Sequence, residues 1–215
     1  MTPGDCQSTY DRVADEYVRR IADELRDKPF DRELLDRFAA IVGDGGLACD
    51  MGCGPGHIAR YLRERGAAVC GVDLSAEMVQ RARQLNPGVE FQQGDMLALD
   101  VPDGVWAGIA AFYSIIHISP GDLPRALGEL HRALQPGGRL LLAFHLGSDV
   151  LHLDEWWGHE VNVDFFLYRS DEMADGLRSA GLEVTEILER DAYPDIEYQG
   201  RRAYIFARKP LSAEG

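Results

Sequence analysis

The sequence is short of long apolar runs, of bases and of cysteines. No apolar stretch approaches the roughly 20 residues that a membrane-spanning helix requires. The opening residues, MTPGDCQSTYDR, lack both the basic flank and the apolar core of a secretory signal. These two absences predict a soluble cytoplasmic protein.

Acids outnumber bases by 36 to 22, and the formal net charge is -14. The bases are scattered through the expected helices and form no single stripe. Such a surface repels phosphate backbones, so DNA and RNA are disfavoured as substrates. We expect a small-molecule substrate, with neither nucleic acid nor a membrane as partner.

The four cysteines are Cys6, Cys49, Cys53 and Cys70. They contain no CxxC pair, and no HxxxH motif accompanies them, so a zinc site is not indicated. We expect reduced thiols rather than disulfides or metal ligands.

The stretch LACDMGCGPGHIARYL, residues 47–62, is the most informative feature of the chain. It predicts a short apolar strand, a loop rich in glycine, and a helix that begins near His57. Glycine suits such a loop because the backbone turns sharply there and because a ligand can approach the main chain where no Cβ intervenes. The loop is therefore a predicted ligand site.

A second strand, residues 67–72, ends at Asp73, and Ser75 follows as a helix cap. In doubly wound sheets an acid at this position accepts hydrogen bonds from both hydroxyls of a ribose. Asp73 is therefore the expected ribose-binding residue. The alternative is that Asp73 only caps the helix together with Ser75.

Further strands are expected at residues 89–92, 105–112 and 139–145. The first leads to Asp95 and Met96, an acid and an apolar side chain that suit the edge and the face of a base. The last is the continuous apolar run typical of a strand buried on both faces. With 215 residues, the chain suits one α/β domain with a modest appendage.

Two amphipathic helices are expected before the first strand. Ser8 is a plausible N-cap of the first, residues 8–27, and the second follows Pro29 and ends at the turn of residues 43–46. The first helix has apolar side chains at spacings of three to four: Tyr10, Val13, Tyr17 and Ile21.

Five motifs occur in order: DMGCGPG at 50–56, VDLSAEM at 72–78, QGDML at 93–97, AFYSIIHI at 111–118 and LQPGGRLLLAFH at 134–145. Together they resemble the class I S-adenosylmethionine-dependent methyltransferases over most of residues 40–207. A competing dinucleotide site needs GxGxxG, whereas Gly56 follows Gly54 by only two positions. The resemblance implies S-adenosyl-L-methionine as the cofactor.

The resemblance also implies a Rossmann-like fold. We expect a doubly wound, mostly parallel seven-stranded sheet whose antiparallel last strand, residues 203–208, lies between the fifth and sixth. Residues 1–40 would be N-terminal helices that cover the active site. Residues 41–210 would form the methyltransferase domain, with a lid insertion after the fifth strand at residues 146–170.

The resemblance carries cofactor contacts over to this chain. The loop backbone would hold the methionine part, Asp50 would reach it through water or its amine, and the backbone near Ala111 would accept from its ammonium. The family often has an acid in the fourth strand, but this chain has WAGIAA there, so we expect no acidic contact from it. The implied cofactor-binding residues are Tyr10, Tyr17, Asp50, Gly52, Cys53, Gly54, Asp73, Leu74, Met78, Asp95, Met96 and Ala111.

The segment 146–170 departs from a minimal family core and is rich in aromatic residues. In methyltransferases of small molecules, insertions here lie over the methyl-bearing end of the cofactor, which implies a substrate lid. The alternative is a satellite core under a long loop. The candidate substrate-binding residues are Tyr113, Trp156, Phe166 and Tyr168.

An activated methyl group needs alignment more than covalent help, so a base matters only when the acceptor carries a proton of high pKa. The candidate catalytic bases are His117, His145 and His159. Many relatives have a histidine at the position of His117, often in a packing role, so both roles stay open there.

His145, His152 and His159 recur every seven residues, which on one continuous helix would form a metal site. Gly147 and Gly158 interrupt that stretch, and we expect no metal. The sequence favours a methyltransferase that acts on a small, partly aromatic molecule. A cofactor-binding regulatory or scaffold protein without turnover is the alternative, and a protein or tRNA substrate is less favoured because no basic groove is evident.

Overall fold

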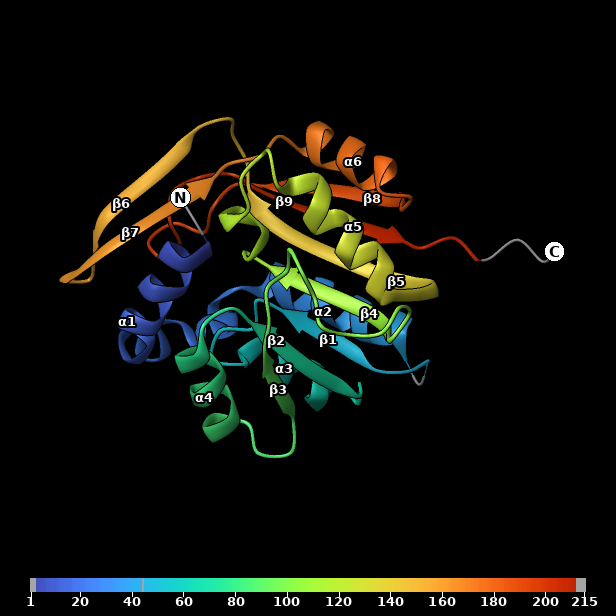
Figure 1. Ribbon diagram of the computed structural model, residues 1–215, viewed down its shortest axis with the longest axis horizontal. Coiled ribbons are helices and arrows are strands. Elements are labelled where there is room, and N and C mark those ends of the chain that lie inside the picture. The colour runs from blue at the N-terminus through green and yellow to red at the C-terminus, as the bar shows by residue number, and fades with distance from the viewer. Residues whose placement is uncertain (1–2, 44, 212–215) are drawn as a thin grey trace.

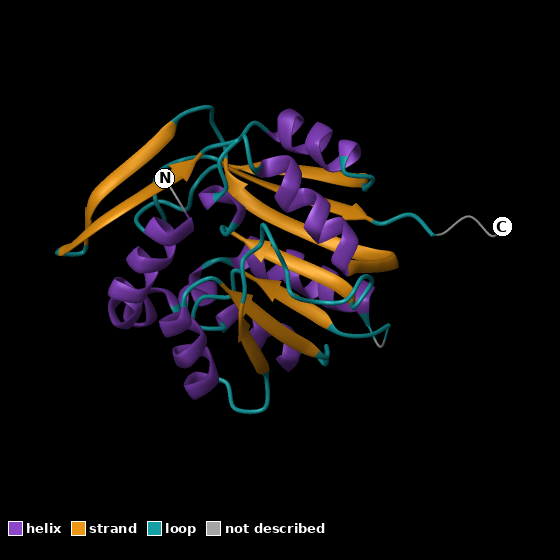
Figure 2. Ribbon diagram, in the orientation of Figure 1, coloured by secondary structure: helices purple, strands orange, loops and turns teal. Residues whose placement is uncertain are grey.

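The computed structural model describes residues 3–43 and 45–211 (Figure 1). Its core is a seven-stranded sheet in the order β3-β2-β1-β4-β5-β9-β8, flanked by helices (Figure 2). These strands are β1 (Ala48–Met51), β2 (Val69–Asp73), β3 (Glu90–Gln93), β4 (Trp106–Phe112), β5 (Leu134–His145), β8 (Glu183–Arg190) and β9 (Arg202–Arg208).

Most neighbouring strands of this sheet are parallel. β1 pairs in parallel with both β2 and β4, as β2 does with β3 and β4 with β5. β9 lies between β5 and β8 and runs antiparallel to both. The predicted fold class, a mostly parallel doubly wound sheet with an antiparallel last strand, is confirmed.

The α-helices are α1 (Pro3–Ile21), α2 (Pro29–Val42), α3 (His57–Glu64), α4 (Ala76–Leu85), α5 (Leu123–Ala133) and α6 (Ser170–Ser179). Two short 3-10 helices are η1 (Glu24–Asp27) and η2 (Ile115–His117). α2, α3 and α4 share one apolar core with the sheet, and α5 and α6 share the other. No helix within the described ranges is long and apolar enough to cross a membrane.

The first helix differs from the predicted span of residues 8–27. It begins earlier and ends at Ile21, and η1 follows as a separate element. Ser8 is therefore not the N-cap, because it lies inside the helix, where its hydroxyl donates to the carbonyl of Asp5 at 3.1 Å. At the other end Arg60 donates to the carbonyl of Ala22 at 2.6 Å, so a partner from α3 satisfies the end of the helix.

The predicted lid segment contains a β-hairpin. β6 (Val150–Trp156) and β7 (His159–Phe166) form a separate two-stranded antiparallel sheet. Trp157 and Gly158 join them with positive φ angles of 55° and 82°, as in the tight turns that suit hairpins. The hairpin projects from the main sheet on the side of α1 (Figure 1).

The hairpin packs directly against α1. The backbone amide of Asn162 donates to Thr9 Oγ1 at 3.3 Å, and the Thr9 hydroxyl donates to the backbone carbonyl of Asn162 at 3.4 Å. Val13 is buried in a small apolar cluster with Val161 and Val163. Two segments far apart in sequence therefore form one layer.

The strand order reverses at β1, because β2 lies on one side of it and β4 on the other. In doubly wound sheets ligands bind in the crevice outside the carboxyl ends of the strands at such a point. The loops that follow β1 and β4 therefore border the expected site.

Candidate functional site

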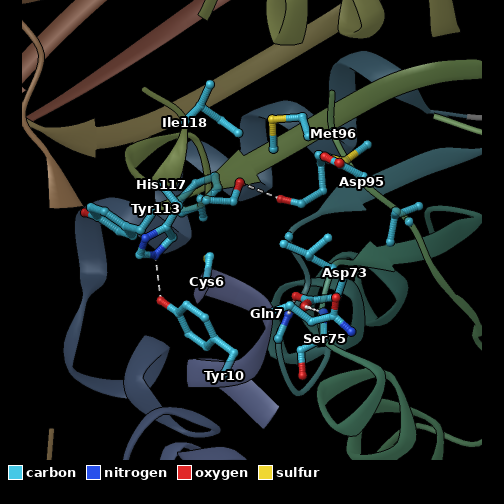
Figure 3. A pocket seen from close by; sticks show the side chains of 18 of the residues that line it. Cys6, Gln7, Tyr10, Asp73, Ser75, Asp95, Met96, Tyr113, His117 and Ile118 are labelled. Carbon is cyan, nitrogen blue, oxygen red and sulfur yellow. Dashed lines mark hydrogen bonds between the residues drawn. The ribbon is translucent and has the colours of Figure 1, made fainter. Parts of the chain in front are cut away.

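A pocket partly open to solvent lies outside the carboxyl ends of β1, β2 and β4, with about 710 Å³ of empty space in the pocket and its open mouth together. Figure 3 shows that Tyr10, Tyr113 and His117 lie at one end, which we call the tyrosine end. Asp73 and Asp95 lie at the other, which we call the acidic end. Both the sheet and α1 therefore contribute to the wall.

The glycine loop after β1 forms the floor of the pocket and follows the predicted strand, loop and helix. Gly52 and Gly54 have φ angles of 71° and 50°, and Gly52 donates to the Val72 carbonyl at 2.7 Å. Ser114, after β4, donates to the Met51 carbonyl at 2.7 Å. The loop and the segment after β4 are therefore in direct contact, and the space beside Gly52 is filled by the Ser114 side chain.

Replacing Gly52 by alanine is expected to lower the free energy of unfolding by about 2–5 kcal/mol. This figure adds the cost of a left-handed backbone conformation in a residue with a Cβ to the cost of an overpacked contact. A Cβ there would lie 2.2 Å from the Cβ of Ser114. Gly66→Ala is the matched control, because Gly66 has a φ of 88° and open space around its missing Cβ. Urea denaturation of both variants checks the prediction, and equal losses would contradict the packing argument.

Asp73 joins the glycine loop to the start of α4. One carboxylate oxygen accepts from the Gly54 amide at 2.7 Å, and the other accepts from the Ser75 amide at 2.8 Å. Ser75 itself caps α4 by accepting from the Met78 amide at 3.1 Å. Burial, with a smaller contribution from the nearby charge of Asp11, raises the pKa of the Asp73 carboxyl to about 6. Each carboxylate oxygen keeps a lone pair for a further donor.

The acidic end also contains the acid and the apolar residue that the sequence predicts after β3. Asp95 and Met96 line the pocket, and Asp95 also accepts from the Leu97 amide at 2.8 Å. The sequence-predicted residues that the structure brings together around this one pocket are Tyr10, Tyr17, Gly52, Gly54, Asp73, Leu74, Asp95, Met96, Tyr113 and His117.

Four predicted cofactor contacts lie behind the wall: Asp50, Cys53, Met78 and Ala111. Asp50 is almost fully buried and accepts from the amide of Ala59 at 2.9 Å, so it caps the start of α3 instead of facing the pocket. Burial raises the pKa of the Asp50 carboxyl to about 7. The structure does not place these four side chains in the pocket wall, whereas Phe112, the neighbour of Ala111, lines the pocket. The predicted contacts through water or through the backbone near Cys53 and Ala111 stay predictions.

The tyrosine end holds a hydrogen-bonded pair from two distant segments. The Tyr10 hydroxyl lies 2.7 Å from Nε2 of His117 (Figure 3). Nδ1 of His117 lies 3.1 Å from the carbonyl of Asp164 on β7. A carbonyl only accepts, so Nδ1 carries the hydrogen and Nε2 accepts from Tyr10. Burial lowers the pKa of His117 to about 4, so its ring is neutral at pH 7.

Tyr113 follows β4 with a φ of 53°, a strained conformation for a residue of this size. Its hydroxyl lies 3.1 Å from that of Tyr204 and donates to Asp31 at 3.5 Å. Asp31 also pairs with Arg190 at 2.7 Å. This buried network fixes the direction in which Tyr113 presents its ring to the pocket.

Two of the three candidate bases do not reach the pocket. His145 ends β5 behind Tyr113, with 5.0 Å between the ring centroids. Burial, together with the charges of Arg202 and Lys28, lowers the pKa of His145 to about 4. His159 begins β7 opposite Trp156, at the turn of the hairpin. The structure therefore leaves His117 as the one candidate base, among those predicted, that lines the site.

Three of the four predicted substrate contacts also lie outside the wall: Trp156, Phe166 and Tyr168. Trp156 packs against the outer side of the pocket tyrosines, with its ring 5.6 Å from that of Tyr10. Tyr168 is buried and donates from its hydroxyl to the Ile118 carbonyl. These aromatics brace the wall, as in the satellite-core alternative, and Tyr113 is the predicted substrate residue that faces the pocket.

The helical alignment of His145, His152 and His159 does not form, because they lie on β5, β6 and β7. Over residues 3–43 and 45–211, no group of three or more His, Cys, Asp or Glu side chains is placed to hold a metal ion.

Several wall residues were absent from the sequence prediction. Cys6 could have been found, because it precedes Tyr10 by four positions on the same helical face. Ser114 had no signal beyond its place two residues after β4. The missed residues are Cys6, Gln7, Met51, Val72, Ser75, Gly94, Phe112, Ser114 and Ile118.

Comparison with known proteins agrees with this geometry. Residues 48–138 match the family model described as "Methyltransferase domain". A malonyl-[acyl-carrier protein] O-methyltransferase of Serratia marcescens is 35% identical over 181 residues, which cover 76% of this chain and 70% of that protein. A demethylmenaquinone methyltransferase of Thermus thermophilus is 37% identical over 99 residues, covering 43% of this chain and 44% of the relative.

Among solved structures, DhpI in its complex with SAH superposes with a TM-score of 0.75 at 19% identity, covering 97% of both chains. That likeness concerns the fold. The chain spans between 35% and 70% of the length of the malonyl-[acyl-carrier protein] methyltransferases that it matches. The chain belongs to the class I S-adenosylmethionine-dependent methyltransferases, and its cofactor is S-adenosylmethionine.

Proposed function

We propose that the protein transfers a methyl group from S-adenosylmethionine to a small-molecule acceptor bound at the tyrosine end. The observation that carries this proposal is the Tyr10–His117 pair, which lies in the same pocket as the acidic end. A neutral imidazole with its acceptor nitrogen turned toward the pocket suits the removal of a proton from an incoming acceptor.

The pocket residues fit the cofactor. Asp73 is a half-buried carboxylate whose two oxygens each retain a lone pair, as two ribose hydroxyls require. Gly52 and Gly54 line the pocket with backbone, and Asp95 and Met96 suit the edge and face of the adenine. When bound, S-adenosylmethionine supplies a methyl group on a positively charged sulfur that is already activated for in-line displacement.

The chain's own residues orient the acceptor and hold its proton. The acceptor donates to the Tyr10 hydroxyl, which in turn donates to Nε2 of His117. The Asp164 carbonyl holds the ring in the required tautomer and stabilises the imidazolium that forms. Tyr113, fixed by Asp31 and Tyr204, limits where the acceptor ring can lie.

In this proposal, α1 and the hairpin close the site. Asp11 on α1 accepts from the Ser75 hydroxyl at 2.5 Å and from the Glu77 amide at 3.2 Å, which ties α1 to α4 over the acidic end. We propose that residues 1–40 and the lid within 146–170 cover the methyltransferase domain of residues 41–210 and exclude water during transfer.

The relatives are named for different acceptors, malonyl-[acyl-carrier protein] and demethylmenaquinone. Calorimetry with S-adenosylmethionine and S-adenosylhomocysteine is expected to show binding of both to protein whose fold is checked by circular dichroism. A mixture of small metabolites with S-adenosylmethionine is expected to yield a product heavier by one methyl group in mass spectrometry. Binding without any product would favour the non-catalytic alternative.

A further inference from the structure

The charges that face the pocket are of one sign. Among the described residues that line it, the charged side chains are those of Asp73 and Asp95. The polar side chains at the tyrosine end are uncharged: Tyr10, Tyr17, Tyr113 and the neutral ring of His117, with the Tyr113 hydroxyl turned away to Tyr204 and Asp31. A carboxylate or phosphate that entered would lose its hydration in this acidic, half-closed space.

Two cations beside the Tyr113 network, Lys28 and Arg190, have carboxylate partners already. Lys28 lies 5.5 Å from the centre of the Tyr113 ring, and its ammonium pairs with Glu24 at 2.6 Å and with Glu197 at 3.4 Å. Arg190 pairs with Glu197 at 2.7 Å as well as with Asp31. Moving either cation toward a bound anion would leave a buried carboxylate unpaired, which is costly.

The Tyr10–His117 pair has a use only for an acceptor that carries a proton. A carboxylate or phosphate is already deprotonated at pH 7 and attacks without a base. A hydroxyl attached to an aromatic ring has a pKa near 10, as tyrosine does, whereas that of water is 15.7 and an aliphatic hydroxyl lies close to water. The pair therefore suits a phenolic proton better than an aliphatic one.

The walls of the tyrosine end are flat. Tyr10 and Tyr17 meet edge to face at 5.6 Å between centroids, and the Tyr10 and His117 rings meet edge to face at 5.2 Å. Tyr113 faces the same space from the sheet (Figure 3). Such rings bind another flat ring by offset or edge contacts.

We infer that the acceptor is an uncharged aromatic compound methylated on a ring hydroxyl, and not a carboxylate or phosphate; this inference rests on the proposed function. The hydroxyl oxygen forms the new bond to the methyl carbon as the carbon–sulfur bond breaks, with its electron pair left on sulfur. The hydroxyl proton passes to Tyr10 while the Tyr10 proton passes to Nε2 of His117. The products are a methyl ether, S-adenosylhomocysteine and an imidazolium that returns its proton to water.

Four probes that share one ring system test the inference: 2-naphthol, 2-naphthalenemethanol, 2-naphthoate and 2-naphthyl phosphate. Their affinities are measured by calorimetry on protein saturated with S-adenosylhomocysteine, and their products with S-adenosylmethionine are identified by mass spectrometry. We expect 2-naphthol to bind at least tenfold more tightly than either anion and to give 2-methoxynaphthalene as the main product.

Three results would overturn the inference: no binding of 2-naphthol, equal or tighter binding of an anion, or methyl 2-naphthoate as the main product. Failure to bind S-adenosylhomocysteine in the first step would instead count against the proposed function. Tyr17→Lys, checked for fold and for S-adenosylhomocysteine binding, adds a cation to the wall and should shift the preference toward 2-naphthoate. An unchanged preference in that variant would contradict the electrostatic explanation.

Discussion

Replacing Asp73 by asparagine is expected to weaken the binding of S-adenosylhomocysteine by about 100-fold or more. The carboxylate has one free lone pair on each oxygen for a ribose hydroxyl, and each hydrogen bond to a charged acceptor contributes about 1.5–3 kcal/mol. An asparagine amide cannot accept from both the Gly54 and Ser75 amides, so the loop that it joins to α4 also loosens. Calorimetry at pH 7.5 measures the loss.

The same carboxylate predicts the pH dependence of cofactor binding. Burial raises the pKa of Asp73 to about 6, and only its ionised form accepts from both hydroxyls. The affinity for S-adenosylhomocysteine is therefore at its maximum above pH 6 and falls as the pH drops through 6. The fall is up to about tenfold per pH unit, until the pH reaches the pKa that Asp73 has in the complex. Asp73→Asn is expected to remove this slope.

Asp103→Asn is the matched control, because Asp103 is an exposed carboxylate paired with Arg132. It should leave both the affinity and its pH dependence unchanged. If Asp73 only caps the helix, its variant would lose thermal stability while the cofactor affinity of the folded fraction stayed within a few-fold of the parent protein.

Replacing His117 by glutamine is expected to lower kcat about 100-fold or more while changing the affinity for S-adenosylhomocysteine only a few-fold. Glutamine can still accept from Tyr10, but it cannot hold a proton, and general-base catalysis contributes about 10²–10⁴-fold. Steady-state kinetics with 2-naphthol, or with any acceptor found in the metabolite mixture, separates kcat from KM.

The packing role that the sequence left open for His117 predicts a different result. Under that role the variant would lose thermal stability and raise KM, with kcat close to that of the parent protein. His152→Gln is the matched control, because His152 lies on the hairpin, is largely exposed, and pairs with Asp164 at 2.8 Å. It removes a histidine near the same strand without touching the pocket, and kcat should not change.

The hairpin was not predicted, although the sequence carried its signals. β7 alternates apolar and polar residues, with Val161, Val163 and Phe165 on one face, and Trp157–Gly158 forms the turn. The aromatic content of the segment predicted a substrate lid instead. Its rings brace α1 from outside, because the hairpin needs an apolar partner for its inner face.

The sequence by itself determined the strand, glycine loop and helix at residues 47–62 and the acids that follow the next two strands. Those features depend on local backbone geometry and on the alternation of strands and helices, which spacing along the chain records. The tertiary structure decided the rest of the site. It turned Asp50 inward to cap α3 and brought Tyr10 to His117 across a separation of 107 residues. Such contacts arise from packing between distant elements, so no local pattern encodes them.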